Sequence, residues 1–321
     1  MNNTMKNQVC NLQVGTTISG KWHKKRYCVL RQLGAGATGV VYLVQSPDGQ
    51  HAALKISFDN SSVTAEVNVL RNFSKVHRAS LGPFLLDVDD WIYCNQALSF
   101  YVMEYVKGQP LLSFVSKRGK EWISILAMQL LGDLEELHKA GWVFGDLKPE
   151  NLVVTGQPIK IRWIDVGGIT LQGRAIKEFT DFYDRAYWGF GSRKAEPSYD
   201  LFSVTMVIIH SAMGKRISKT DHSVQQLKSI IKTNPSLQPY HHVLYKAITG
   251  QYRSASDMKQ EMIHASKGYT RKEGVKKRQN VRHASTRHVK VKKKRAHLLE
   301  TLILCTSVMF IYILYLFMQV L

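Results

Sequence analysis

The stretch VFGDLKPENLVV, residues 143–154, places a carboxylate, an amine and a carboxamide within six positions: Asp146, Lys148 and Asn151. A reaction that moves a phosphoryl group needs a base on the attacking hydroxyl, a cation on the moving group and an oxygen ligand for Mg²⁺. These three side chains can supply those functions in that order. The spacing therefore predicts phosphoryl transfer, with Asp146 as base, Lys148 as cation and Asn151 as a metal ligand.

A glycine-rich run, LGAGATGVVYLV, places Gly34, Gly36, Gly39 and Val41 in the pattern G-x-G-x-x-G-x-V. Glycine lets backbone N–H groups approach phosphate oxygens because no Cβ intervenes. Dinucleotide-binding folds share the first six positions, but there the loop opens a helix. Here β-branched residues follow the glycines, so the run predicts a hairpin lid over phosphates.

Three more motifs follow the glycines along the chain: AALK at 52–55, YVMEYVKGQPL at 101–111 and IDVGG at 164–168. Together with the glycine run and DLKPEN, they resemble the protein-kinase superfamily, specifically the bacterial Hanks-type serine/threonine kinases. The resemblance covers about residues 26–266. It implies an α+β, bilobal fold, with a small β-rich lobe and a helical large lobe. It also implies ATP as phosphoryl donor, Ser/Thr residues of protein substrates as acceptors, and autophosphorylation.

The resemblance also implies site residues. Lys55 would contact the α- and β-phosphates, and Glu66, eleven residues later, would hold it. That short gap predicts that either the following helix or the approach to it is trimmed. Asp165 stands in the place of the D-F-G aspartate and would chelate Mg²⁺, or Mn²⁺, beside Asn151. The implied ATP-binding residues are Gly34, Gly36, Gly39, Val41, Ala53, Lys55, Glu66, the gatekeeper Met103, and Glu104 and Val106 of the hinge.

The sequence departs from the kinase pattern at several positions. Phe144 and Gly145 stand where His and Arg are usual, so the loop lacks the arginine that pairs with a phosphorylated activation loop. We therefore expect kinase activity that does not depend on phosphorylation of the activation loop through that arginine. The usual histidine is largely a packing residue, so we expect the Phe144 ring to be tolerated in its place. The A-P-E motif is missing. Its glutamate is the usual partner of a buried arginine, which Arg253 matches here, and Glu196 is a candidate to replace that glutamate. Asp200 matches the aspartate that opens the central helix of the large lobe.

Lys55, Asp146, Asn151 and Asp165 are all retained, which favours an active kinase. Two other classes of function remain: a catalytically inactive pseudokinase scaffold, and a nonspecific tether for nucleic acid or membrane. ATP turnover separates the first class from the others. Loss of DNA binding on removal of the basic linker described below would identify the tether.

The elements that must position these residues follow from their patterns. Residues 27–33, 40–46 and 51–58 have strand character, residues 61–73 have helical spacing, and 91–106 return to strand character. Helices dominate after residue 110. One runs through 121–140 with Gly141 at its C-terminal end. Another, SYDLFSVTMVIIHSAMG, is apolar nearly all round and is predicted to be a core helix.

Composition divides the chain into a polar lead-in (1–25), the kinase-like domain (26–266), a basic linker (267–297) and an apolar end (298–321). The four cysteines form no C-x-x-C pair and the N-terminus has no apolar signal region. Residues 301–321 carry no charge and suffice for about 30 Å of helix, the thickness of a bilayer core. The sequence predicts a single-pass C-terminal anchor in the cell membrane, with the kinase domain in the cytoplasm because the flank is basic.

The linker carries 13 of the 44 Lys/Arg residues and one acid. It could contact anionic lipid, bind DNA without sequence preference, or act as a tail phosphorylated at Ser285 and Thr286. We hypothesise that DNA binds it and raises activity, with trans-phosphorylation in a dimer as one route. The tail anchor and the lead-in GTTISGKWH resemble the YabT-like, sporulation-associated kinases of Gram-positive bacteria. The candidate residues for DNA or anionic lipid are Lys276, Lys277, Arg278, Arg282, Arg287, Lys290, Lys292, Lys293, Lys294 and Arg295.

Overall fold

The computed structural model describes residues 3–76 and 82–268, together with 302, 304, 306, 307 and 309. The chain divides into two compact units, Met1–His264 and Ala265–Leu321. The candidate basic residues 276–295 lie outside the described residues, as does most of the predicted anchor. Among the residues that are described, no helix is both long enough and apolar enough to cross a bilayer.

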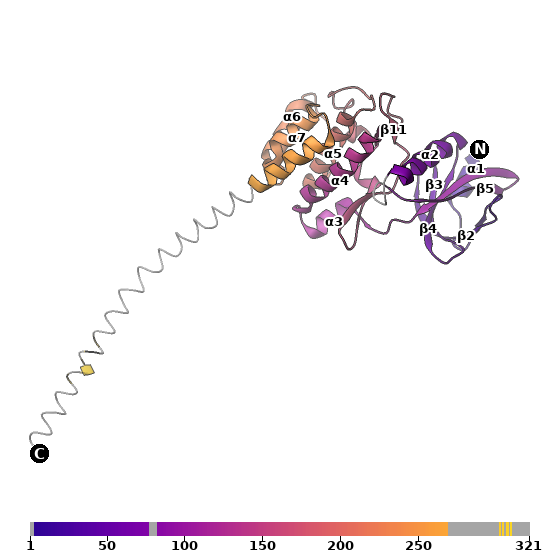
Figure 1. Cartoon of the computed structure of the whole chain (residues 1–321), viewed down its shortest axis with the longest axis horizontal. Helices are drawn as coiled ribbons and strands as arrows, with labels where there is room; N and C mark the ends of the chain where they lie inside the picture. Colours follow the sequence, from indigo (N-terminus) through magenta and orange to yellow (C-terminus); the bar gives the residue numbers. More distant parts are fainter. Residues whose placement is uncertain are drawn as a thin grey trace, which may run out of the picture. The chain divides into compact units, whose positions relative to one another are not determined.

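The first lobe is built on one antiparallel sheet of six strands in the order β1-β2-β3-β4-β6-β5 (Figure 1). In β2 and β5, buried and exposed side chains alternate in part, whereas the central strands β3 and β4 are buried along nearly their whole length. Their bounds are β1 Thr17–Ser19, β2 Arg26–Ala35, β3 Gly39–Gln45, β4 His51–Ser57, β5 Leu85–Tyr93 and β6 Gln96–Glu104. The predicted strands at 27–33, 40–46 and 51–58 are confirmed by β2, β3 and β4.

The segment predicted as one extended run, 91–106, is a hairpin. Strands β5 and β6 meet at Cys94 and Asn95, which both have positive φ, 49° and 62°. A two-residue turn with positive φ at both positions matches the twist of its strands. Because Cys94 is an unusual residue for such a turn, the hairpin is hard to predict from the residue types at this position.

The described part of the lead-in, residues 3–25, is part of this lobe, whereas the sequence predicted a polar segment ahead of the domain. Helix α1 (Asn3–Cys10) and strand β1 place Met5, Val9 and Ile18 in the same apolar core as the sheet. The Tyr42 hydroxyl also donates a hydrogen bond to the Val9 carbonyl oxygen at 2.7 Å. Only a few apolar residues make these contacts, and they are spread thinly among polar ones, so composition alone does not reveal them.

Helix α2 (Asn60–Val76) follows β4 after two intervening residues. Of the two alternatives that the Lys55–Glu66 spacing predicted, the short approach is therefore confirmed, while the helix itself has 17 residues. The helix buries Val63, Val67 and Leu70 on the face that the sequence pattern indicated. Glu66 lies on the same side, which directs it toward the sheet.

The second lobe is helical. Helix α4 (Trp122–Lys139) ends just before Gly141, whose φ of +84° is the left-handed conformation expected at a helix end. Helix α5 (Pro197–Met213) is buried from Tyr199 to Ala212, which confirms the predicted core helix. The remaining helices are α3 Leu111–Arg118, α6 Ser223–Thr233 and α7 His241–Ile248, and residues 255–268 are also helical.

Short strands position the loops between these helices. Strand β9 (Leu152–Thr155) pairs with β10 (Lys160–Trp163) on one side and with β7 (Gln109–Pro110) on the other. Strand β8 (Trp142–Val143) pairs with β11 (Thr170–Leu171). The 3₁₀ turn η1 (Pro149–Asn151) lies directly before β9. The segment with Asp146 and Asn151 is thus held between two strand pairs, as is the segment with Asp165.

Candidate active site

Lys55 and Glu66 form a buried ion pair. The Lys55 Nζ donates to both carboxylate oxygens of Glu66 at 2.8 Å, and the two residues are 5% and 4% exposed. A second donor, the hydroxyl of Tyr101 on β6, makes a third hydrogen bond, to Glu66 Oε2 at 2.5 Å. Burial and the Glu66 charge raise the Tyr101 pKa well above its usual value, so this hydroxyl keeps its proton. The sequence indicated the first pair but gave no sign of Tyr101.

The glycine run forms the turn between β2 and β3. Gly36 N donates to Gly39 O at 2.9 Å, and the chain continues as a strand, as predicted. A Cβ on Gly39 would lie 2.4 Å from the Ile56 carbonyl oxygen on β4, so only glycine fits there. A Cβ on Gly34 or Gly36 would meet no atom within 4 Å. The backbone at those two positions is open to a ligand.

Asp146 contacts Lys148 directly, and the Asn151 side-chain amide donates to the Asp146 carbonyl oxygen at 2.9 Å. Thr180 Oγ1 lies 3.2 Å from Asp146 Oδ1 and 3.4 Å from Lys148 Nζ. Burial raises the pKa of the Asp146 carboxyl, and its hydrogen bond with Lys148 opposes that rise. Thr180 lies outside every motif in the sequence, so its contact with Asp146 could not be foreseen.

Asp200, at the start of α5, fixes the backbone of this loop. Its carboxylate accepts hydrogen bonds from Phe144 N at 2.8 Å and Gly145 N at 3.0 Å, and it contacts His138 Nε2 at 2.8 Å. The Asp200 side chain has no exposed surface. Because the two backbone donors come from positions 144 and 145, their side chains are free to differ from the usual pair.

The replacements at these two positions fit their surroundings. Phe144 is 1% exposed and packs edge-on against Trp163, with ring centroids 5.0 Å apart. Gly145 has φ +82°, and a Cβ there would lie 2.7 Å from the carbonyl oxygen of Gly168. An arginine at position 145 would therefore require the loop to move.

Asp165 lies close to the ion pair and to Asp146. Its Oδ1 accepts a hydrogen bond from Gly167 N at 3.0 Å. A Cβ on Gly167 would lie 3.4 Å from both Asp165 Oδ1 and Glu66 Oε1. A Cβ on Gly168 would lie 2.7 Å from the Asp146 Cβ. The glycines after Asp165 thus let three carboxylates converge.

A fourth carboxylate, that of Glu178, approaches the same region from the later part of the chain. Burial, followed by the charge of Asp165, raises the Glu178 pKa, while Lys55 lowers it. A Cβ on Gly167 would lie 3.6 Å from Glu178 Oε2. Nothing in the local sequence distinguishes Glu178 from a surface acid, because the fold alone brings it here.

The hinge residues lie at the end of β6. Met103 pairs with Ala53 across the sheet, and both are 5% exposed, while Val106 is 8% exposed. The Glu104 side chain is held by Arg162 of β10 through two hydrogen bonds of 2.6 and 2.9 Å. Its carboxylate is therefore committed to Arg162, and its backbone N–H donates to the Phe84 carbonyl oxygen at 2.8 Å. Of Glu104, this leaves the backbone carbonyl to face a nucleotide.

Two expectations about the end of the domain need correction. Arg253, expected to be buried, is exposed because it lies in the bend between α7 and the helical residues that begin at 255. Glu196 binds Arg185 instead, at 2.6 Å. Arg185 also donates to the Ser192 carbonyl oxygen and to Ser198, so the pair holds the segment's own ends together. Arg185 is eleven residues from Glu196 along the chain, so Glu196 pairs with it and not with Arg253.

The described residues contain no group of three or more His, Cys, Asp or Glu side chains placed to hold a metal ion. The two predicted metal ligands supply one amide oxygen and one carboxylate, which suits a hard cation that also takes oxygens from a substrate. Asn151 uses its nitrogen on the Asp146 carbonyl, which leaves its side-chain oxygen for such a cation.

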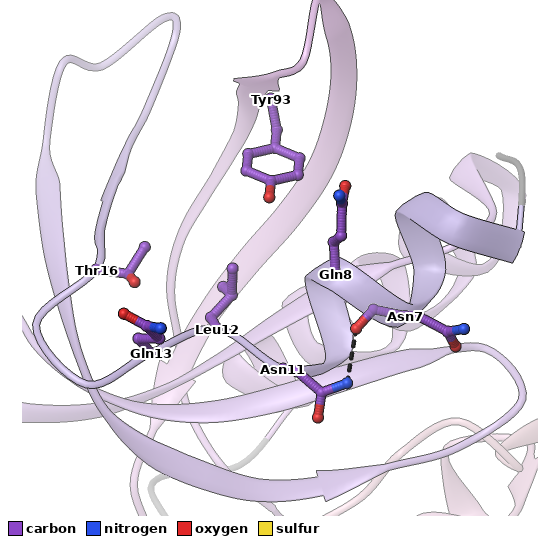
Figure 2. A pocket seen from close by; sticks show the side chains of 7 residues that line it. All are labelled: Asn7, Gln8, Asn11, Leu12, Gln13, Thr16 and Tyr93. Atoms are coloured by element: carbon purple, nitrogen blue, oxygen red, sulfur yellow. Dashed lines mark hydrogen bonds between the residues drawn. The ribbon is translucent and has the colours of Figure 1, made fainter.

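A separate hollow lies on the first lobe (Figure 2). Its lining consists of uncharged side chains from α1, from the residues after it and from β5: Asn7, Gln8, Asn11, Leu12, Gln13, Thr16 and Tyr93. None of the predicted site residues lines it. The lining contains no carboxylate, imidazole or amine, so it offers neither a carboxylate base nor a cation for phosphoryl transfer.

Comparisons with known proteins agree with this geometry. Residues 27–289 match the family model described as protein kinase domain. The chain is 52% identical over 279 residues to the serine/threonine-protein kinase YabT of Bacillus subtilis (strain 168), covering 86% of this chain and 82% of that protein. It is 31% identical over 240 residues to the serine/threonine-protein kinase ppk25 of Schizosaccharomyces pombe, covering 68% and 53%. It is 26% identical over 225 residues to the serine/threonine-protein kinase AfsK of Streptomyces griseus, covering 65% and 27%.

Proposed function

This chain belongs to the protein kinase family and is a serine/threonine protein kinase, and from that premise we propose that Asp146, Lys148, Lys55, Asn151 and Asp165 carry its reaction. The family uses ATP and a divalent metal, and its substrates are proteins. For this chain we propose Mg²⁺ as the metal, with Mn²⁺ as a substitute.

In the proposed reaction Asp146 accepts the proton of the substrate hydroxyl. Lys148, in contact with Asp146, neutralises charge on the phosphoryl group as it moves. Thr180 contacts both side chains and so keeps the pair in one orientation. The hydroxyl oxygen forms the new bond to the γ-phosphorus, and ADP leaves with the electrons of the broken bond.

The nucleotide phosphates are positioned from three directions. Lys55 faces them in the orientation set by Glu66, and the backbone at Gly34 and Gly36 covers them. Asn151 and Asp165 would hold the divalent cation. When bound, that cation neutralises phosphate charge and orients the γ-phosphate.

The single observation that carries this proposal is the buried Lys55–Glu66 pair. Burying two opposite charges costs several kcal/mol, and only close, well-aligned hydrogen bonds between the two groups offset that cost. A kinase needs this pair before it can transfer phosphate. A scaffold without catalysis has no such requirement.

The test is transfer of radiolabel from ATP with Mg²⁺ to the full-length protein itself and to a generic Ser/Thr substrate. We expect the wild type to label both, and Asp146→Ala to label neither. A matched variant, Asp221→Ala at an exposed site, should behave as the wild type. Equal inactivity of the wild type and Asp146→Ala would instead support a pseudokinase scaffold.

We further propose that residues 298–321 anchor the protein in the cell membrane, with the kinase domain in the cytoplasm and the basic linker beside the bilayer. The charge-free run 301–321 and the 13 cations of 267–297 support this. Fractionation of cells should place the full chain with the membranes, and protease added outside the cell should leave the kinase domain intact. Full-length protein recovered without detergent in the soluble fraction would contradict it.

We also propose that the linker binds DNA and that bound DNA raises kinase activity by bringing two molecules together, since the linker's cations exceed what orientation in the membrane requires. Full-length protein in detergent should bind duplex DNA with an affinity that falls steeply with salt. Replacing Lys292, Lys293 and Lys294 by Gln should reduce both binding and its salt dependence. Unchanged binding in that variant would remove the proposal, and binding with unchanged activity would remove its regulatory part. The likeness to YabT-like kinases extends the proposal to a role in sporulation, which deletion of the gene would test.

A further inference from the structure

The segment between Asp165 and α5 is tied into one conformation. Gly173 N donates to Ala195 O at 2.8 Å, Ile176 N to Arg193 O at 2.8 Å, and Ala195 N to Arg174 O at 2.7 Å. These bonds make a short antiparallel ladder from the segment's two ends, residues 173–176 and 193–195. Side chains on the ladder are therefore presented in fixed positions.

A buried carboxylate fastens the middle of the same segment. Asp184 accepts hydrogen bonds from the backbone N–H groups of Ala186 and Tyr187, each at 3.1 Å, and from the Tyr199 hydroxyl at 3.0 Å. Arg193 Nε completes the set at 2.8 Å. The segment is thus ordered without a phosphorylated residue, in keeping with the glycine at position 145.

Four cations gather on this ladder, and we call them the basic face: Arg174, Lys177, Arg193 and Lys194. All four are exposed. Within the described part of the chain, Arg174, Lys177 and Lys194 form no ion pair, although the pKa of Glu196, lowered mainly by its hydrogen bond with Arg185, is also lowered by the Lys194 charge. Arg193 is bound to Asp184 and lies 3.8 Å from the ring of exposed Phe179. The bridge between Ala175 and Lys194 brings the two ends of the face together.

The basic face begins beside the reacting groups. Thr180 contacts Asp146, and Lys177 lies three residues before Thr180. Three residues span at most about 10 Å, so the Lys177 backbone lies no farther than that from Thr180. A peptide whose acceptor hydroxyl is at Asp146 would therefore have its neighbouring residues within reach of the Lys177 side chain. Of the acids in the same stretch, Glu178 is half buried beside Asp165, and Asp181 is exposed. Two further acids nearby, Glu150 and Glu196, are paired with Arg216 and Arg185. The three unpaired cations of the face therefore leave the exposed charge around the acceptor position net positive.

We propose, on the basis of the function above, that the basic face selects protein substrates with acidic residues within two to four positions of the acceptor Ser or Thr. Opposite charges across an exposed interface attract each other and exclude like-charged partners. Each exposed ion pair contributes modestly, so three of them together should favour an acidic peptide by about tenfold. The closeness of the face to Asp146 favours a peptide over a nucleic acid as its partner.

The test compares three peptides of one sequence, each with a single Ser, in which the positions two to four residues from it on either side are all Glu, all Gln or all Lys. Full-length protein in detergent is assayed with ATP and Mg²⁺ at low salt. We expect kcat/KM for the Glu peptide to exceed that for the Gln peptide by about tenfold, with the Lys peptide below both. The preference should shrink as salt is added, because exposed charges are screened.

Two variants assign the preference to the basic face. In Arg174→Gln/Lys177→Gln/Lys194→Gln the ratio of kcat/KM for the Glu and Gln peptides should fall to near one. In Lys117→Gln/Lys120→Gln/Lys232→Gln, which removes three exposed lysines elsewhere on the same lobe, the ratio should stay as in the wild type. Because all six residues are exposed, both variants should keep the wild-type melting temperature.

The outcomes separate this inference from the function on which it rests. A wild type that phosphorylates the Glu and Gln peptides equally well overturns the inference and leaves the kinase activity standing. A preference for the Glu peptide that persists in Arg174→Gln/Lys177→Gln/Lys194→Gln overturns the assignment to the basic face. If that variant also loses DNA binding, the face binds nucleic acid and does not select the peptide. A wild type that labels neither itself nor any peptide overturns the proposed activity and the inference with it.

Discussion

At the scale of single residues, the Glu66 carboxylate depends on Tyr101 as well as on Lys55. The Tyr101 hydroxyl donates the third hydrogen bond to this carboxylate, at 2.5 Å, and a hydrogen bond to a charged group contributes about 1.5–3 kcal/mol. Tyr101→Phe should therefore loosen the pair and lower kcat/KM for ATP by about tenfold or more. Steady-state kinetics of the full-length protein measures this.

The matched control for Tyr101→Phe is Tyr42→Phe. Tyr42 is also buried in the first lobe and its hydroxyl also donates one hydrogen bond, to the Val9 carbonyl oxygen. Tyr42→Phe should cost stability without a comparable loss of kcat/KM. If both variants lost the same activity, Tyr101 would act through general stability and not by positioning Glu66.

Gly145 presents a second residue-scale prediction. Gly145→Ala should destabilise the protein by about 1–3 kcal/mol, because the new Cβ would lie 2.7 Å from Gly168 O in a left-handed backbone. Gly173→Ala separates the two causes, since Gly173 has φ +85° but open space around it. Denaturant unfolding should show the larger loss for Gly145→Ala. Equal losses would mean that backbone strain alone matters at both sites.

Residue types and spacing predicted a large part of this site, because Lys55, Asp146, Asn151 and Asp165 stand in contiguous motifs. The residues that escaped prediction act across the fold. Tyr101, Thr180 and Glu178 are each ordinary in their local sequence, and each reaches the site only when strands and loops are assembled. The Arg253 expectation failed for the same reason, since burial at that position depends on a partner that Arg185 already occupies.

At the scale of elements, the contact between α4 and the last helical residues contains a carboxyl that titrates near neutrality. Burial raises the pKa of Asp133 to about 7, and Lys259 opposes that rise. The unfolded chain ionises this carboxyl near pH 4. Stability from the protonated form is therefore full below about pH 4 and is lost as the pH rises to about 7, by up to about 4 kcal/mol.

Asp133→Asn should remove this dependence. The variant should gain stability over the wild type as the pH rises from 5 to 8, as measured by urea unfolding in detergent at both values. Asp221→Asn, at an exposed position, should show no such gain. A difference between Asp133→Asn and the wild type that is the same at pH 5 and pH 8 would refute the assignment to Asp133.

The elements themselves were largely predictable, for physical reasons that also explain the exceptions. Helices α4 and α5 have long periodic or apolar patterns that only a buried or half-buried helix satisfies. Helix α1 and strand β1 are short and polar, and they are stabilised by tertiary contacts of Met5, Val9 and Ile18. Short elements stabilised in this way leave little trace in local composition.

At the scale of the whole kinase domain, the two lobes are tied together at the hinge. Arg162 of the large lobe donates to both oxygens of Glu104, at the end of β6, and to the Gly82 carbonyl oxygen at 2.6 Å. Adenine is expected to bind beside this same hinge segment. The tie therefore connects the lobe orientation to the nucleotide position.

Arg162→Lys tests this connection while keeping the positive charge. A lysine has no planar fork, so it cannot hold both Glu104 oxygens and Gly82 O at once. We expect a loss of about 1–3 kcal/mol in unfolding free energy and a several-fold rise in KM for ATP, with a smaller change in kcat because Asp146 and Lys148 are untouched. Arg216→Lys is the control, since Arg216 makes one exposed pair with Glu150 and lies over the Tyr183 ring, where a lysine can also lie, so the change should cost less than about 1 kcal/mol. A KM for ATP that is unchanged in Arg162→Lys while stability falls would show that the tie supports the fold alone and does not position the hinge for the nucleotide.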